Sequence, residues 1–249
     1  MDTISIILLI VGGLATGFIN TLAGGGSIIS LSLLMFLGLD ANVANGTNRI
    51  AIVFQSLASS SSFKKGGMLD LKQSRWLTVP AVVGSLVGAW IAVDVPKEII
   101  EKSIGIAMLM MAFLMFYKPE QWLQGKAELM AKPISIGKVA LFFTIGIYGG
   151  FIQVGIGYLL LAGLVLNAGY DLVKANALKV FITFVYSPFA LLVFIYHHQI
   201  HWYFGLVLAA GAALGGYFAS KIALKKGSSF VRWFIVGVIA LSCVKIFFF

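Results

Sequence analysis

Apolar residues occur along this chain in long blocks that are separated by short polar stretches. The ten blocks cover roughly residues 4–23, 27–39, 43–63, 76–93, 99–117, 134–153, 158–168, 172–196, 202–220 and 230–249. Eight of them are long enough to cross a hydrocarbon core of about 30 Å, which takes roughly 20 residues. The pattern therefore predicts an all-α polytopic membrane protein.

The second and seventh blocks are too short to cross, and glycines precede both of them. The sequence GGGS starts at Gly24, and GIGY starts at Gly155. Glycine lets a chain turn sharply inside the membrane, where unwound backbone is tolerated if protein surrounds it. We expect each short block to be a broken half-helix that follows a glycine-rich break.

The second half of the chain repeats the first. GFINTLAGGGS (17–27) aligns with GFIQVGIGY (150–158) after a two-residue deletion, which places Asn20 over Gln153. LDANVANGTNR (39–49) aligns with YDLVKANALKV (170–180), and farther on Gly84 falls over Gly215. The repeat predicts a first transmembrane half at 1–117, a cytoplasmic linker at 118–133 and a second transmembrane half at 134–249, with about five helical segments in each half.

Lysine and arginine predict how the two halves are oriented. Most of these residues fall on one face if the blocks alternate across the membrane, and cytoplasmic loops are enriched in them. The loop after block 43–63 carries Lys64 and Lys65, whereas its counterpart after block 172–196, HHQIHW, has neither lysine nor arginine. This reversal is expected of inverted repeats, in which an odd number of crossings turns the second half over.

Composition narrows the class of protein further. The chain is 60% hydrophobic and 11% charged, so little is left for a soluble catalytic or nucleic-acid-binding domain. The net charge of +9 lies mainly in the short loops, where topology already explains it. Cys243 is the only cysteine, which excludes an intramolecular disulfide and a cysteine-based metal site. We expect no cofactor and no metal.

The two glycine-rich breaks are the strongest candidates for a binding site. Free backbone N–H groups and the partial positive charge at the start of a helix favour an anion, and Ser27 could add a hydroxyl donor. The alternative is that these glycines only allow helices to pack closely.

Two cations inside apolar blocks, Arg49 and Lys179, point to the same chemistry. A charged side chain in the membrane is costly, so it is typical of a functional site, although snorkelling to the interface is an alternative. Neighbouring amides and a hydroxyl would add donors for an oxyanion. The predicted substrate site comprises Asn20, Gly24, Gly25, Gly26, Ser27, Asn45, Thr47, Asn48, Arg49, Gln153, Gly155, Gly157, Asn176 and Lys179, with Arg49 favoured over Lys179 as the source of charge.

The motifs at the first break resemble those of a known family. GFIN ending at Asn20, the AGGGS run that follows, and ANGTN at 44–48 are similar to the first-repeat signature of the TauE/SafE sulfite exporter family, also called the 4-toluene sulfonate uptake permease family. The resemblance implies a multi-pass carrier of a bacterial-type plasma membrane for sulfite, sulfonates or related small sulfur anions. The second half departs from the pattern, because Gly46-Thr47-Asn48 becomes Ala177-Leu178-Lys179.

The leading hypothesis is a secondary transporter that works by alternating access, since the chain has no GxxxxGKS motif. An anion channel and a structural membrane subunit are the alternatives. A membrane enzyme would need acidic or histidine clusters near the midplane, and the sequence shows none. The partners are the lipid bilayer and a small anion but no nucleic acid, and glycines such as Gly84 and Gly88 would allow a homodimer.

Overall fold

A computed structural model describes residues 3–69, 71–96, 98–100, 102–103 and 135–248. Its helices are α1 (Thr3–Leu22), α2 (Ser27–Phe36), α3 (Ala41–Lys65), α4 (Leu71–Asp94), α7 (Ile136–Phe151), α8 (Ile156–Ala162), the π-helical η2 (Gly163–Asn167), α9 (Leu172–Tyr196) and α10 (Trp202–Phe248). The described part is all-helical, as the apolar blocks predicted. Of the predicted helix at 99–117, only residues 99–100 and 102–103 are described, and the linker at 118–133 lies outside the described residues.

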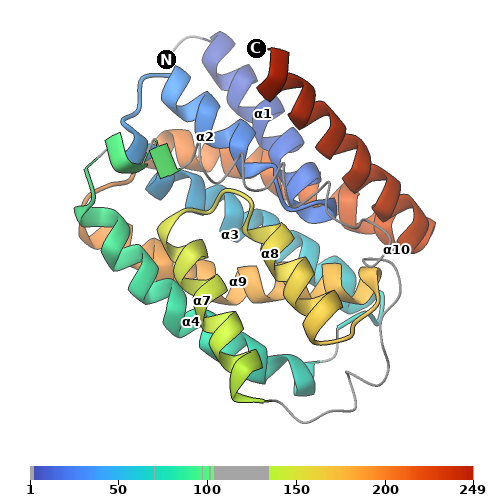
Figure 1. The fold of residues 1–249 in the computed structure, drawn as a ribbon. Coiled ribbons are helices and arrows are strands. Elements are labelled where there is room, and N and C mark those ends of the chain that lie inside the picture. Colours follow the sequence, from blue (N-terminus) through green and yellow to red (C-terminus); the bar gives the residue numbers. More distant parts are fainter. Residues whose placement is uncertain (1–2, 70, 97, 101, 104–134, 249) are drawn as a thin grey trace.

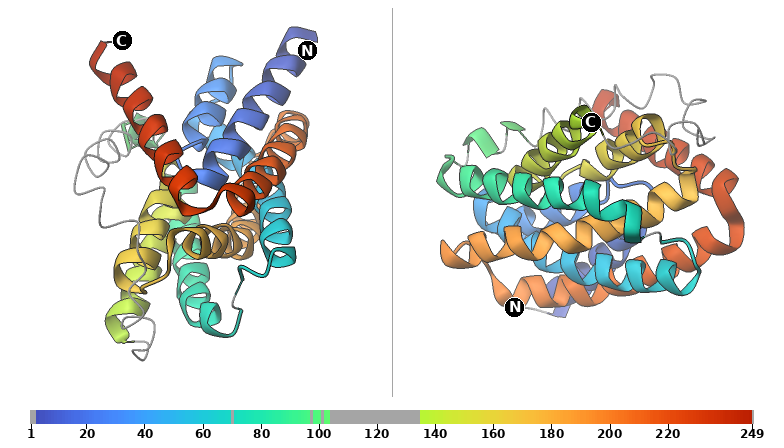
Figure 2. Two further views of the ribbon diagram at one scale, coloured as in Figure 1. Left: turned by 90° about the vertical axis from the view of Figure 1, so that its right-hand side faces the viewer. Right: turned by 90° about the horizontal axis from the view of Figure 1, so that it is seen from below.

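The predicted blocks agree well with the helices, including the two short ones. α10 contains the last two blocks, which a sharp bend at Gly227 (φ 71°, ψ −168°) separates. Figure 2 shows the two arms of α10 diverging from this bend. Four described spans are long and apolar enough to cross a membrane, namely Thr3–Leu22, Ser74–Asp94, Leu172–Tyr196 and Trp202–Val231. Of the other four blocks expected to cross, 43–63 lies in α3, which carries many polar residues, and 134–153 contains α7, which has only 16 residues. Blocks 99–117 and 230–249 lie largely outside the residues that were searched for spans.

α3 and α9, the third helix of each half, pack against each other at the centre and run in opposite directions (Figure 1). The start of α3 meets the end of α9, where a Cβ on Gly46 would lie 2.8 Å from a ring carbon of Phe194. The end of α3 shares an apolar cluster with the start of α9, through Phe63 and Leu172. The halves are therefore interleaved rather than side by side.

Two outer helix pairs flank this centre, and each pair combines both halves. α1 packs along α10, and α4 packs along α7. Glycines let the backbones approach: a Cβ on Gly17 would collide with the carbonyl of Ala212, and one on Gly146 would collide with that of Ala81. Each half thus supplies the first helix of one pair and the fourth helix of the other.

The helix boundaries correct the sequence alignment around the breaks. Leu22 and Phe151 both end a helix and Ser27 and Ile156 both begin one; each pair is 129 residues apart. Both breaks are therefore four residues long, 23–26 and 152–155, with no deletion. Asn20 consequently corresponds to Gly149 rather than to Gln153, a shift of four residues.

The rest of the predicted alignment agrees with the packing. α3 and α9 begin at Ala41 and Leu172, 131 residues apart, as expected from the aligned LDANVANGTNR segment. Gly84 faces the carbonyl of Phe143, and Gly215 faces that of Leu14, so the two glycines make corresponding contacts. Because Gly84 and Gly88 both pack against α7 within the protomer, they do not supply a surface for the homodimer that they were predicted to allow.

Exposed lysines gather at one end of the bundle. The end of α3 lies beside the bend of α10, where a Cβ on Gly66 would lie 2.7 Å from Leu224. This end carries the exposed residues Lys64, Lys65, Lys174, Lys221, Lys225 and Lys226. His197, His198 and His201 lie at the opposite end, where the amide N–H of His201 donates to the Thr47 hydroxyl at the start of α3 (2.9 Å). The charge segregation expected from the sequence is present in the fold.

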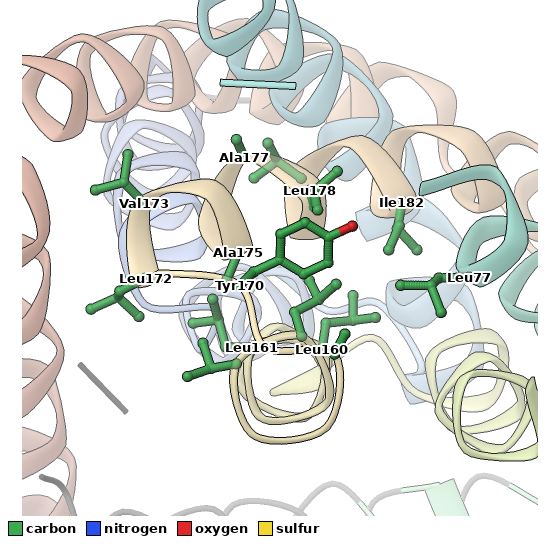
Figure 3. Close-up of a cluster of buried hydrophobic side chains, with 14 of the residues drawn as sticks. Leu77, Leu160, Leu161, Tyr170, Leu172, Val173, Ala175, Ala177, Leu178 and Ile182 are labelled. Carbon is green, nitrogen blue, oxygen red and sulfur yellow. The ribbon is translucent and has the colours of Figure 1, made fainter. Parts of the chain in front are cut away.

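The largest apolar core surrounds the start of α9. Figure 3 shows leucine, valine and alanine side chains of α8 and α9 converging around Tyr170, with Leu77 of α4 on one side. This apolar packing fixes α8 against α9, directly beside the second break.

Candidate functional site

The two glycine-rich breaks touch each other at the centre of the protein. A Cβ on Gly24 would lie 2.5 Å from the Cα of Gly157, so only glycine fits this contact. Gly24 has a φ of +101°, which also favours glycine. The Tyr158 ring lies against Gly25. The breaks of the two halves are therefore in direct contact.

A small cavity of about 20 Å³ lies between the breaks. This is room for about one water molecule, which is less than an oxyanion of sulfur needs. Its walls are Asn20, Gly24, Ser27, Ile52, Gln55, Gln153, Ile156, Gly157, Lys179, Val180 and Thr183. Structurally equivalent positions of the two halves line it, such as Gly24 with Gln153 and Ser27 with Ile156. The cavity therefore lies where the halves meet symmetrically.

Lys179 supplies the positive charge of this cavity. Its side chain is only 2% exposed, and its ammonium Nζ donates to the carbonyls of Asn20 and Thr21, both at 2.9 Å. These carbonyls belong to the last turn of α1, where helical partners are missing. A lysine ammonium has three donors, so one remains after these two bonds.

Arg49 occupies the related place in the other half but does not line the cavity. Its guanidinium Nη1 donates to the carbonyl of Gly149 (3.1 Å) and its Nη2 to that of Gly150. These carbonyls are the structural equivalents of those that Lys179 binds. The guanidinium also stacks over Phe194, 4.5 Å from the ring centroid. Asn45 extends the set, because its Nδ2 donates to the carbonyl of Phe151 (2.8 Å).

A network of polar side chains supports the first break. The Nδ2 of Asn20 donates to the hydroxyl of Ser27 (3.1 Å) and to Oε1 of Gln55 (3.2 Å). Its Oδ1 accepts from the backbone N–H of Ser27 (3.1 Å), which is the first residue of α2. Asn20 thus holds the start of α2 in place. At the second break, the Nε2 of Gln153 donates to the hydroxyl of Tyr186 (2.9 Å).

Asn176 has no hydrogen-bond partner among the described residues, although it is fully buried. Both its Nδ2 and its Oδ1 are unpaired. Its counterpart Asn45 pairs its Nδ2 with the end of α7, as described above. A buried amide left without partners costs about 1–3 kcal/mol per group, so this arrangement is unfavourable in the present conformation.

Six of the predicted site residues line the cavity: Asn20, Gly24, Ser27, Gln153, Gly157 and Lys179. The others lie around it in supporting positions. Gly25, Gly26 and Gly155 shape the breaks, Asn48 accepts from the Ser30 hydroxyl (2.6 Å), and Thr47 caps the start of α10. Asn45, Arg49 and Asn176 lie on the central helices, as already described.

Sequence reasoning missed five lining residues: Ile52, Gln55, Ile156, Val180 and Thr183. Thr183 follows Lys179 by four residues and Gln55 follows Asn48 by seven, so helical periodicity could have found both. Among the described residues, no cluster of histidine, cysteine, aspartate and glutamate could hold a metal ion. The donors around the cavity suit an anion.

Comparison with known proteins shows the family of this chain. The family model described as "Sulfite exporter TauE/SafE" matches residues 9–246. The chain belongs to the TauE/SafE family. It is similar to a probable membrane transporter protein, ORF9, of Sinorhizobium sp. (27% identity, covering 92% of this chain and 87% of the relative). It also resembles YunE of Bacillus subtilis (25% identity, 98% of each chain) and YfcA of Escherichia coli (25%, 93% and 86%).

No solved structure gives a significant match to this TauE/SafE protein. The relatives are probable membrane transporters of bacteria, and the described helices include four that could span a membrane. The protein is thus a multi-pass membrane transporter of the bacterial inner membrane. The family is one of membrane transporters.

Proposed function

We propose that this protein is a secondary transporter that moves a small sulfur-containing anion, such as sulfite, a sulfonate or a related organosulfur anion, by alternating access. The observation that carries the proposal is the buried ammonium of Lys179 at the cavity between the two breaks. The name of the family model supports the sulfur chemistry. The substrate binds where the two halves meet.

Lys179 supplies the charge that attracts the anion. Its bonds to Asn20 and Thr21 aim the ammonium at neutral carbonyls, so its positive charge is not cancelled by a carboxylate. Charge-assisted hydrogen bonds are roughly twice as strong as neutral ones, and their strength increases where water is excluded. An oxyanion in the cavity would accept a hydrogen bond from the third N–H of the ammonium.

Neutral donors around the cavity complete the anion site. The Ser27 hydroxyl and the start of α2 lie on one side, and the Gln153 amide lies on the other. The N-terminal end of a helix carries a partial positive charge that stabilises an anion. None of the described residues that line the cavity is an aspartate or glutamate, so none of them repels a negative substrate.

The interleaved halves support alternating access. α3 and α9 are antiparallel, and the outer pairs α1–α10 and α4–α7 make equivalent glycine contacts. This reciprocity is expected of inverted repeats that rock around a shared midplane site. The cavity is too small for the anion in this conformation, so substrate binding requires the breaks to separate.

Flux into proteoliposomes tests this function. Sulfite, sulfate, thiosulfate and short sulfonates are first screened for binding to the purified protein. Each is then placed inside the vesicles, and the uptake of the same anion from outside is measured. We expect saturable exchange for at least one sulfur anion, stimulated by the same anion on the opposite side. Unitary currents across a planar bilayer would indicate a channel and contradict the carrier. Failure of all four anion types to bind would refute the substrate class.

A further inference from the structure

One hydrogen bond distinguishes the end of α7 from the end of α1, whose carbonyls are otherwise bound in equivalent ways. On α3, Asn45 and Arg49 together bind three consecutive carbonyls at the end of α7, those of Gly149, Gly150 and Phe151. On α9, Lys179 binds the equivalents of the first two at the end of α1, which belong to Asn20 and Thr21. The third equivalent is the carbonyl of Leu22.

By this correspondence, the partner expected for Asn176 is the carbonyl of Leu22. Asn176 is the counterpart of Asn45, and Leu22 is the counterpart of Phe151, since both residues end their helices. Yet both amide atoms of Asn176 are buried and unpaired in the part of the chain that the structure describes. One hydrogen bond of a symmetric pair is made, and the other is not.

We propose that Asn176 is a positioning residue, which binds the carbonyl of Leu22 in the opposite state of the transport cycle, while Asn45 releases that of Phe151. This proposal rests on the alternating-access function. If the two halves are equivalent, the opposite state arises when they exchange conformations. The amide that is unpaired in this state then becomes the paired one, and the end of α1 takes the position that the end of α7 has now.

The two asparagines therefore bias the transporter in opposite directions. Asn176→Leu removes an unpaired amide from the present state and a hydrogen bond from the opposite state, so both effects favour the present state. Asn45→Leu removes a hydrogen bond from the present state and favours the opposite one. A purely structural amide would lower stability without changing which side of the membrane the cavity faces.

Accessibility of the cavity from each side measures this bias. The background is full-length Cys243→Ser protein in sealed membrane vesicles, with Ser27→Cys as the reporter in the cavity wall. A membrane-impermeant maleimide is added to right-side-out and to inside-out vesicles, and the ratio of the two labelling rates is recorded. Asn42→Leu is the matched control, because the Asn42 amide binds the carbonyl of Val95 away from the breaks (2.9 Å).

We expect the labelling ratio to shift by about three- to tenfold in opposite directions for Asn45→Leu and Asn176→Leu, relative to the background protein. The double variant should return close to the original ratio, and Asn42→Leu should leave it unchanged. Shifts in the same direction, or no shift from Asn176→Leu in protein that is folded by its melting temperature, would overturn the proposal.

A parallel flux assay separates this inference from the proposed function. If the unsubstituted protein exchanges a sulfur anion but the two variants do not shift labelling oppositely, the positioning role of Asn176 is wrong and the transport function stands. If the unsubstituted protein exchanges none of these anions and the cavity of the Cys243→Ser, Ser27→Cys protein is labelled from one side only, the proposed function itself fails.

Discussion

The ends of α1 and α7 are alike in their unpaired carbonyls but differ in the cation that binds them. Both helices stop inside the protein, and each leaves carbonyls without helical partners. Lys179 binds the end of α1, and Arg49 binds the end of α7. Each cation comes from the central helix of the opposite half. The two halves are therefore tied together crosswise at their breaks.

The two cations do not occupy equivalent sequence positions, and this difference separates their roles. Lys179 aligns with Asn48, whereas Arg49 aligns with Val180. Successive residues of an α-helix are rotated by about 100°, so the two side chains leave their helices in different directions. Lys179 lines the cavity, but Arg49 lies over Phe194 outside it. In the proposed function, Lys179 is available to a substrate, whereas Arg49 only holds a helix end.

The largest effect expected from this comparison is that of Lys179→Met on anion transport. Methionine keeps much of the volume but removes the charge, so a bound anion loses the one cationic partner among the described residues of the cavity wall. Hydrogen bonds to charged groups contribute about 1.5–3 kcal/mol, which corresponds to roughly a 10- to 100-fold loss of affinity. The half-saturating concentration for sulfite or sulfonate exchange in proteoliposomes measures this loss.

Arg49→Met is the matched comparison for that experiment. It leaves the carbonyls of Gly149 and Gly150 without partners and should lower the melting temperature, but the protein that remains folded should keep its affinity for the anion. If both substitutions weaken affinity equally, the separation of roles is wrong. Lys179→Arg, which retains the charge, shows whether a loss in Lys179→Met comes from charge or from misfolding.

A second comparison concerns Gly24, where the two breaks touch. Gly24→Ala places a Cβ 2.5 Å from the Cα of Gly157 and also strains a backbone with φ of +101°. The control is Gly38→Ala, where φ is +93° but nothing lies within 4 Å of the added Cβ. Backbone strain alone costs about 1–3 kcal/mol, so the control should lose some stability.

Gly24→Ala should lose more stability than Gly38→Ala and should also lose transport, because the breaks cannot close on each other. The melting temperature and the exchange rate of both variants measure the difference. Equal behaviour of the two alanine variants would mean that contact between the breaks does not matter for transport.

The sequence predicted the helices and the breaks because the signals for both are local. Apolar blocks define the helices, and glycines before short blocks mark where they break. The sequence could single out Lys179, which lines the cavity, because a lysine inside an apolar block is rare. The segregation of lysines to one end also followed from the sequence, since each block reverses the direction of the chain.

The alignment of the breaks could not be fixed from the sequence, for a physical reason. GFIN and GFIQ match well, but the fold places them one helical turn apart. A shift of four residues returns a helix almost to the same face, so the apolar pattern fits both alignments equally well. Only the helix ends, the glycine contacts and the carbonyls bound by Arg49 and Lys179 distinguish them.

The position of Arg49 outside the cavity was equally hidden. The sequence favoured it as the binding charge because polar neighbours surround it. In the fold those neighbours have separate partners: Asn48 binds Ser30, and Asn45 binds the end of α7. Which face of α3 points to the cavity depends on how α3 packs against α2, α9 and α10, which no local pattern encodes.

The smallest effect expected is that of Ser27→Ala, which tests the start of α2 as part of the anion site. The Ser27 hydroxyl lines the cavity and accepts from Asn20, so its loss removes one neutral hydrogen-bond donor and loosens one support. A neutral hydrogen bond contributes about 0.5–1.5 kcal/mol, so affinity should fall about 2- to 10-fold. Ser30→Ala is the control, because this hydroxyl lies one turn farther along α2, binds Asn48 and does not line the cavity. Binding titration of both purified variants with the best sulfur anion should show a loss for Ser27→Ala alone. An equal loss for Ser30→Ala would mean that α2 contributes through its packing, and the anion site would then be restricted to Lys179 and the second break.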